Sequence, residues 1–105
     1  MKKPVLHLST YCYDFDRLQI NKIYFGSALI KNIGNDTLKI FQVETDCGCT
    51  KAFVSKKQLL PNDTCLISFA FSTQHKQGIQ EEFIYIYANT DSLVHPLKIK
   101  SFVYE

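Results

Sequence analysis

The sequence contains no tryptophan, only one methionine and no long apolar stretch. A membrane-spanning helix needs about 18 consecutive apolar residues, and no segment of this chain reaches that length. The chain starts with a basic Met1-Lys2-Lys3, but Pro4 follows and polar residues interrupt the next apolar run. A signal peptide has a hydrophobic region of roughly 7–15 residues, which is missing here. We therefore expect no transmembrane segment, and either a cytoplasmic chain or one whose leader is absent from this sequence.

The chain also lacks a large excess of charge of either sign. Twelve Lys and Arg residues stand against 10 Asp and Glu residues, which gives a formal net charge of +2. The basic residues are scattered, and the densest run, Lys56-Lys57, is typical of a solvated loop. A nucleic-acid-binding surface needs Lys and Arg clustered on one face. The sequence therefore predicts no nucleic-acid partner.

The familiar catalytic motifs are missing as well. The chain has no G-x-S-x-G elbow, no glycine-rich phosphate loop and no H-E-x-x-H helix motif. His7, His75 and His95 are widely spaced, and no motif pairs any of them with a nucleophile. Glu81 and Glu82 are adjacent, so in a strand they face opposite sides, and we expect them to be solvated at a strand end. The sequence predicts no enzymatic activity and no cofactor.

The residues that are present favour an all-β fold. Six Tyr and eight Phe residues occur among 105 residues, and such aromatic richness is typical of sheets. Apolar residues alternate with polar ones, and Gly, Pro, Asn and Asp punctuate the runs about every ten residues. This pattern is typical of an immunoglobulin-like antiparallel β-sandwich, here a single domain over residues 1–105. About seven strands are predicted, near 4–11, 22–31, 37–44, 50–54, 64–72, 81–88 and 96–104.

The alternation also predicts which residues are buried. The expected core consists of inward-facing residues of four strands: Ile40, Ile67, Phe69, Phe71, Ile86, Leu97 and Ile99. Residues 81–88 are apolar on both faces, which indicates a central strand with Tyr85 and Tyr87 partly exposed. The first and last strands, 4–11 and 96–104, are the expected sheet edges, where a partner could bind.

The most specific motif is Asp46-Cys47-Gly48-Cys49-Thr50, between two predicted strands. In an extended strand the two cysteines face the same way, with α-carbons about 6.6 Å apart, near the upper limit for a disulfide. Gly48 allows the backbone to tighten and bring the sulfurs closer. Three interpretations follow: two half-buried thiols with a structural role, a redox pair, or a clamp for Cu(I) or Zn(II).

We favour the structural interpretation of Cys47 and Cys49, with no obligatory metal and no turnover chemistry. No histidine stands near the pair in the sequence, which disfavours zinc. The neighbouring Asp46 disfavours thiolate formation, and Lys51 offsets only part of that effect.

Two further cysteines, Cys12 and Cys65, lie far apart in the sequence. Cys65 is in phase with Ile67 and Phe69, so it is expected to point inward as a small apolar residue. Cys12 lies between two tyrosines, and the sequence offers no support for a bond between it and Cys65. Four cysteines allow three disulfide connectivities, and the spacing does not choose among them.

The segment from Phe15 to Val103 resembles the bacterial family DUF1573, a domain of unknown function. The matching motifs follow the family order: Asn32-Ile33-Gly34, Leu38-Lys39-Ile40, Asp46 to Thr50, Pro61-Asn62, Ile67 to Phe71, Gly78, Ile86 to Asn89 and Leu97 to Val103. Three positions depart from the pattern. Asp16, Asn62 and Ser101 replace family glycines, and Asn62 tolerates the same left-handed backbone.

The resemblance implies an immunoglobulin-like sandwich related to ASH and major-sperm-protein domains. Members are commonly exported and often lipid-anchored, so it also implies a periplasmic or cell-envelope location with the leader trimmed. The family has no established activity. We expect a non-enzymatic binding or structural module with a protein or glycan partner; the alternative is a thiol-based redox or soft-metal protein that uses Cys47 and Cys49. Asp36-Thr37-Leu38 and Asp91-Ser92-Leu93 also match a bacterial O-glycosylation motif, a short pattern that arises by chance.

Overall fold

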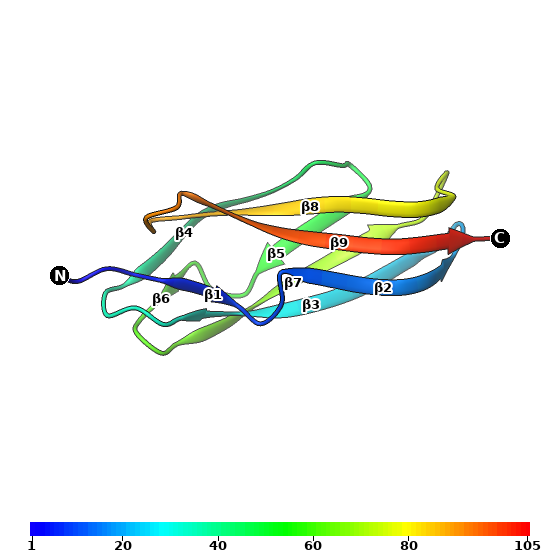
Figure 1. The fold of residues 1–105 in the computed structure, drawn as a ribbon. Coiled ribbons are helices and arrows are strands. Elements are labelled where there is room, and N and C mark those ends of the chain that lie inside the picture. Colours follow the sequence, from blue (N-terminus) through cyan, green and yellow to red (C-terminus); the bar gives the residue numbers. More distant parts are fainter.

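The computed structural model describes residues 1–105 and contains only β-strands (Figure 1). Nine strands follow one another along the chain: β1 (Leu6–Leu8), β2 (Cys12–Gln19), β3 (Ile23–Asn32), β4 (Leu38–Thr45), β5 (Thr50–Val54), β6 (Gln58–Leu59), β7 (Thr64–Ser72), β8 (Gly78–Ala88) and β9 (Val94–Tyr104). The structure has no helix long and apolar enough to span a membrane.

The strands form two facing sheets, one with the order β1-β3-β7-β5 and one with the order β2-β9-β8-β4-β6. All pairs are antiparallel except β2 and β9, which run parallel. The molecule is elongated, 52 × 19 × 18 Å, and its two termini lie at opposite ends (Figure 1). The predicted immunoglobulin-like β-sandwich is confirmed, with nine strands rather than seven.

Two strands were not expected from the sequence. β2 contains Asp14, Asp16 and Arg17, which hide its alternation, and its register shifts between Asp14 and Arg17. β6 has only two residues, too few for a periodic pattern. The prediction that the last strand is a sheet edge is wrong, because β9 lies between β2 and β8. The prediction that the first strand is an edge is confirmed, because β1 pairs only with β3.

The core lies between the sheets and confirms the predicted set. All seven expected residues are buried, and β8 is central with Tyr85 and Tyr87 half-buried. A smaller second cluster of Leu18, Phe71 and Val103 lies apart from the main one, and Cys49 packs against it. The cysteine motif therefore borders the hydrophobic interior.

Two positions where the family pattern has glycine adopt the left-handed backbone here. Asp16 has φ 64° and Asn62 has φ 72°. Asp16 lies at the register shift of β2, where its N–H donates to Asp14 Oδ1 at 2.7 Å. The expectation that Asn62 takes a left-handed conformation is confirmed. Asn and Asp tolerate this region better than other non-glycine residues because their short side chains bond locally.

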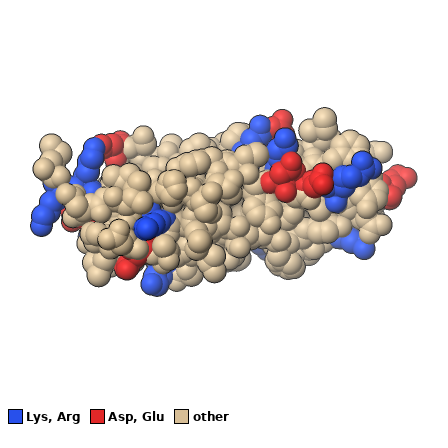
Figure 2. Space-filling view, turned by 60° about the horizontal axis from the view of Figure 1, so that its bottom comes forward, with Lys and Arg blue, Asp and Glu red and all other residues tan.

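Charged side chains do not form a broad patch of one sign on the face that Figure 2 shows. Basic and acidic residues lie near one another toward the two ends, and the middle of that face is occupied by uncharged residues.

Candidate functional site

The Cys47-Gly48-Cys49 turn links β4 to β5, and its two cysteines are joined in a disulfide. Their α-carbons are 5.2 Å apart, closer than the spacing of about 6.6 Å in an extended strand. The backbone has therefore tightened at Gly48, as its presence indicated. The interpretation of the pair as two separate thiols does not describe this structure.

Hydrogen bonds on both sides hold the turn in place. The Thr50 N–H donates to the Cys47 carbonyl at 3.1 Å, and Thr45 Oγ1 lies 3.2 Å from the same oxygen. Asp46 is tied to β8, because the Phe83 N–H donates to Asp46 Oδ1 at 3.1 Å and the Asp46 N–H donates to the Phe83 carbonyl at 3.3 Å. Asp46 therefore continues the pairing of β4 with β8 and fixes the start of the turn to β8.

Glu82 lies beneath the disulfide. Glu82 is 8% exposed, and both of its carboxylate oxygens lie 3.2 Å from Cys49 Sγ. The Thr50 hydroxyl donates to Glu82 Oε2 at 2.9 Å. The expectation that Glu82 is solvated at a strand end is wrong, because it follows the inward phase of Ile84 and Ile86 in β8.

Lys76 places a positive charge beside both Glu82 and the sulfur of Cys47. Its Nζ lies 3.4 Å from Glu82 Oε1 and 3.6 Å from Cys47 Sγ. Lys76 belongs to the connection between β7 and β8, 29 residues from Cys47, so no pattern in the sequence around the cysteines points to it. Lys76 therefore offsets part of the negative charge of Asp46 and Glu82 around the two cysteines.

Cys47, Cys49 and Glu82 form the one cluster in the structure that offers three metal-ligating atoms. Cys47 Sγ, Cys49 Sγ and a Glu82 carboxylate oxygen all lie within 4.8 Å of one another, and no histidine belongs to the cluster. Soft metals bind thiolates. A disulfide provides none, so a metal could enter this cluster only after the bond is reduced.

The disulfide adds little as a covalent staple. A cross-link stabilises a fold mainly by restricting the unfolded chain, and the effect grows with loop length, reaching about 3 kcal/mol for 15 residues. Cys47 and Cys49 are only two positions apart. The bond therefore restricts the unfolded chain less than a long-range disulfide does.

Cys12 and Cys65 are both free, and no bond joins them. Cys65 is buried in the main core, as its phase with Ile67 indicated, while Cys12 is exposed. Burial raises the pKa of the Cys65 thiol above its ordinary value. Cys65 is therefore an inert neutral thiol.

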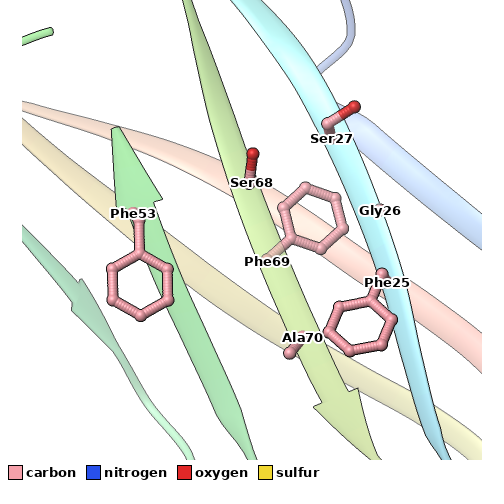
Figure 3. A pocket seen from close by; sticks show the side chains of 7 residues that line it. All are labelled: Phe25, Gly26, Ser27, Phe53, Ser68, Phe69 and Ala70. Carbon is pink, nitrogen blue, oxygen red and sulfur yellow. The ribbon is translucent and has the colours of Figure 1, made fainter. Parts of the chain in front are cut away.

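A second surface of interest is the outer face of β3, β7 and β5. Phe25 in β3 and Phe53 in β5 are 76% and 67% exposed, and they flank the smaller side chains of β7 (Figure 3). Together they border a shallow groove lined by Phe25, Gly26, Ser27, Phe53, Ser68, Phe69 and Ala70.

Further apolar side chains extend this surface, which we call the aromatic face. Ile23, Leu29 and Leu66 are exposed on the same side of the sheet. The charged residues of the face are Lys31 and Lys51, and none of its outward positions is acidic. Single exposed apolar residues are ordinary, but a contiguous group of them marks an interaction surface.

Comparison with known proteins identifies the family. The family model described as "Protein of unknown function (DUF1573)" matches residues 6–103. The chain belongs to this family. Its description names no activity, and no curated protein matches the chain. The sequence resemblance is therefore confirmed over nearly the whole domain.

Solved structures show the same fold at low sequence identity. A Porphyromonas gingivalis W83 protein of unknown function has a TM-score of 0.85 and 20% identity, over 94% of this chain and 46% of that one. The seventh PapD-like (ASH) domain of human CEP192 has a TM-score of 0.70 and 10% identity, over 95% of this chain and 85% of that one. The Vibrio cholerae VesB protease has a TM-score of 0.72 and 9% identity, over 95% and 32%. The DUF1573 domain spans less than half of the first and third of these proteins.

Proposed function

We propose that this DUF1573 domain is a non-enzymatic binding module of an exported bacterial protein, and that its aromatic face binds a protein partner. The observation that carries the proposal is the exposure of Phe25 and Phe53 on either side of the groove (Figure 3). Burial of a Phe side chain contributes roughly 1.5–3 kcal/mol relative to its exposure. Aromatic anchors in a groove are typical of interface hot spots.

Charge indicates the chemistry of the partner. Lys31 and Lys51 lie on the outer side of β3 and β5, and no outward position of the face is acidic. Complementary charge steers association and fixes the orientation of a complex. The partner that fits is a protein with an apolar centre and carboxylates at the rim of its contact surface.

A protein suits the groove better than a glycan does. A sugar needs many polar partners for its hydroxyl groups, and the only side chains with hydrogen-bonding groups in the groove are Ser27 and Ser68. The rings beside them are Phe, which has no polar tip. The chemistry of the groove therefore favours apolar side chains as occupants.

The Cys47–Cys49 disulfide supports the export part of the proposal. Disulfides persist in the periplasm and outside the cell, whereas the cytosol keeps thiols reduced. Fractionation of cells that express the native open reading frame tests it. Recovery in the envelope or periplasm is expected, and recovery in the cytoplasm would contradict export.

Site-specific photo-crosslinking tests the binding face. A photoreactive phenylalanine replaces Phe53, and the control position is Phe41, an exposed phenylalanine in β4 of the other sheet. We expect a crosslinked protein from position 53 and not from position 41. The reverse pattern, or none at position 53, would contradict the aromatic face.

The identified protein is then purified and titrated against the parent domain and two variants. We expect Phe25→Ser with Phe53→Ser to weaken the Kd at least about tenfold, or ~1.4 kcal/mol, and Phe41→Ser to leave it unchanged. Equal affinities would overturn the proposal. So would loss of binding on deglycosylation of the partner, which would indicate a glycan, or sedimentation as a dimer through this face.

A further inference from the structure

We infer that the Cys47–Cys49 disulfide is a reversible thiol–disulfide exchange site for dithiols. Lys76 contacts the sulfur that the dithiol attacks, and Glu82 contacts the sulfur that leaves. The inference goes beyond the proposed binding function, because it adds transfer of an electron pair between this domain and a thiol-bearing molecule.

The first argument is the contact between Cys49 and Glu82. In the disulfide, Cys49 Sγ carries no proton, so the carboxylate oxygens at 3.2 Å receive no hydrogen bond from it. After reduction, the Cys49 thiol at the same place donates to Glu82. The carboxylate therefore interacts more favourably with the reduced pair than with the oxidised pair, which gives the site a preference between its two redox states.

The second argument is the contact between Cys47 and Lys76. The ammonium group lies 3.6 Å from Cys47 Sγ, and a nearby cation favours the thiolate over the thiol. The thiolate is the nucleophile in thiol–disulfide exchange. Lys76 is held by Glu82 at 3.4 Å and is itself partly buried, so its charge is positioned rather than free in solvent.

The third argument is access to the sulfurs. Gly48 is exposed at the tip of the turn, and a β-carbon built there would meet no atom within 4 Å. Cys47 and Cys49 are half-buried rather than buried, so an incoming thiol can approach the bond from the side of the turn.

The exchange balances in atoms and electrons. One thiol of the dithiol gives its proton to Glu82, whose carboxylate oxygen lies within 4.8 Å of both sulfurs, and attacks Cys47 Sγ as a thiolate. The Cys47–Cys49 bond breaks, and Cys49 leaves with the electron pair and takes that proton from Glu82. The second thiol then gives its proton to solvent, attacks the sulfur of the dithiol that is bonded to Cys47, and releases Cys47 as a thiolate beside Lys76. The dithiol is oxidised to a disulfide, the pair is reduced by two electrons, and the reverse sequence reoxidises it.

The experiment uses the full chain with Cys12→Ser, which removes the exposed free thiol, and dithiothreitol as the dithiol probe. The rate of opening of the Cys47–Cys49 bond is followed by alkylation and mass spectrometry between pH 6 and 9, with circular dichroism to show that the fold persists. We expect reversible reduction in the folded state. Reduction only after unfolding would overturn the inference.

Matched variants separate a role in exchange from a structural role. Glu82→Gln keeps the shape but cannot carry a proton, and we expect exchange about tenfold slower or more. Its control is Glu81→Gln, the adjacent glutamate, which is exposed. Lys76→Met is expected to slow alkylation of reduced Cys47 at pH 7, Lys76→Arg to restore it, and Lys57→Met, at an exposed lysine in a loop, to leave it unchanged.

Equal rates in the variants and their controls would overturn the inference. If Glu82→Gln fails to fold, the comparison of Lys76→Met with Lys76→Arg still decides, because absence of any difference between them contradicts the role of the cation. Tight one-to-one binding of Zn(II) or Cu(I) by the reduced chain, with loss of exchange, would also overturn it and indicate a metal carrier.

Discussion

The ring of Tyr13 lies against Gly26 across the two sheets, and a β-carbon at Gly26 would lie 2.8 Å from Tyr13 Cζ. Tyr13 belongs to β2 of one sheet and Gly26 to β3 of the other. Phe69 completes the contact, with its ring centroid 4.9 Å from that of Tyr13 in an edge arrangement. The missing side chain at Gly26 is what allows these two rings to meet.

Gly26→Ala is therefore expected to lower the free energy of unfolding by about 1–3 kcal/mol, because the added methyl group overlaps both rings. Urea denaturation measures the change. Gly48→Ala is the control, since no atom lies within 4 Å of the position its β-carbon would take. A Gly26→Ala variant as stable as the parent would contradict this packing.

Asn32 is fully buried, and its side chain links the segment before β1, the β3–β4 connection and β6. Its amide nitrogen donates to the carbonyls of Asp36 and Leu59 at 2.7 and 3.0 Å, and its Oδ1 accepts from the N–H groups of Val5 and Gly34. Asn32→Ala removes these partners from one buried and three part-buried backbone groups, and we expect the free energy of unfolding to fall by roughly 2–4 kcal/mol. Asn35→Ala, at an exposed position, should lose less than about 1 kcal/mol in the same measurement.

Ser101 replaces a family glycine and is buried in β9, where its hydroxyl has no hydrogen-bond partner. An unpaired buried hydroxyl is destabilising. Ser101→Ala is expected to raise the free energy of unfolding by about 1 kcal/mol, seen as a higher Tm in calorimetry. A lower Tm would mean that the hydroxyl has a partner in solution.

His95 should make stability depend on pH. Burial holds its pKa below the ordinary 6.5, and its Nε2 lies 2.6 Å from Thr90 Oγ1, near the exposed Lys3–Asp91 ion pair. The unfolded chain therefore binds the proton more readily than the folded one. Stability from this group is complete above pH 6.5 and is lost as the pH falls through the lower folded pKa. Urea denaturation at pH 7.5, 6.5 and 5.5 should show this fall in the parent and a smaller one in His95→Gln.

The sequence was sufficient for the sandwich because burial follows a period of two in its main strands. Ile67, Phe69 and Phe71 alternate with smaller or more exposed residues, and all three are buried. β2 was not predicted because its left-handed Asp16 and shifted register break the alternation of buried and exposed residues. The parallel partner of β9 could not be expected without β2.

The site was predicted only in part, for a related reason. The Cys-Gly-Cys spacing located the motif, but Glu82 and Lys76 reach it from β8 and from the connection before β8, about 30 residues away. Glu82 did carry a signal, since it shares the inward phase of Ile84 and Ile86. Lys76 carried none, because its position depends on how the β7–β8 connection folds over the turn.

The parallel pairing of β2 with β9 has a mechanical consequence. The termini lie at opposite ends of the molecule, and β2 and β9 both run toward the C-terminal end (Figure 1). Once β1 has been pulled away from β3, a force that pulls the two ends apart draws β2 backward and β9 forward along their common direction. The hydrogen bonds between them, which extend to the Ile20 N–H on the Tyr104 carbonyl and the Lys98 N–H on the Tyr11 carbonyl, are then loaded together in shear rather than opened one after another. The domain is thereby built to resist stretching along its 52 Å axis.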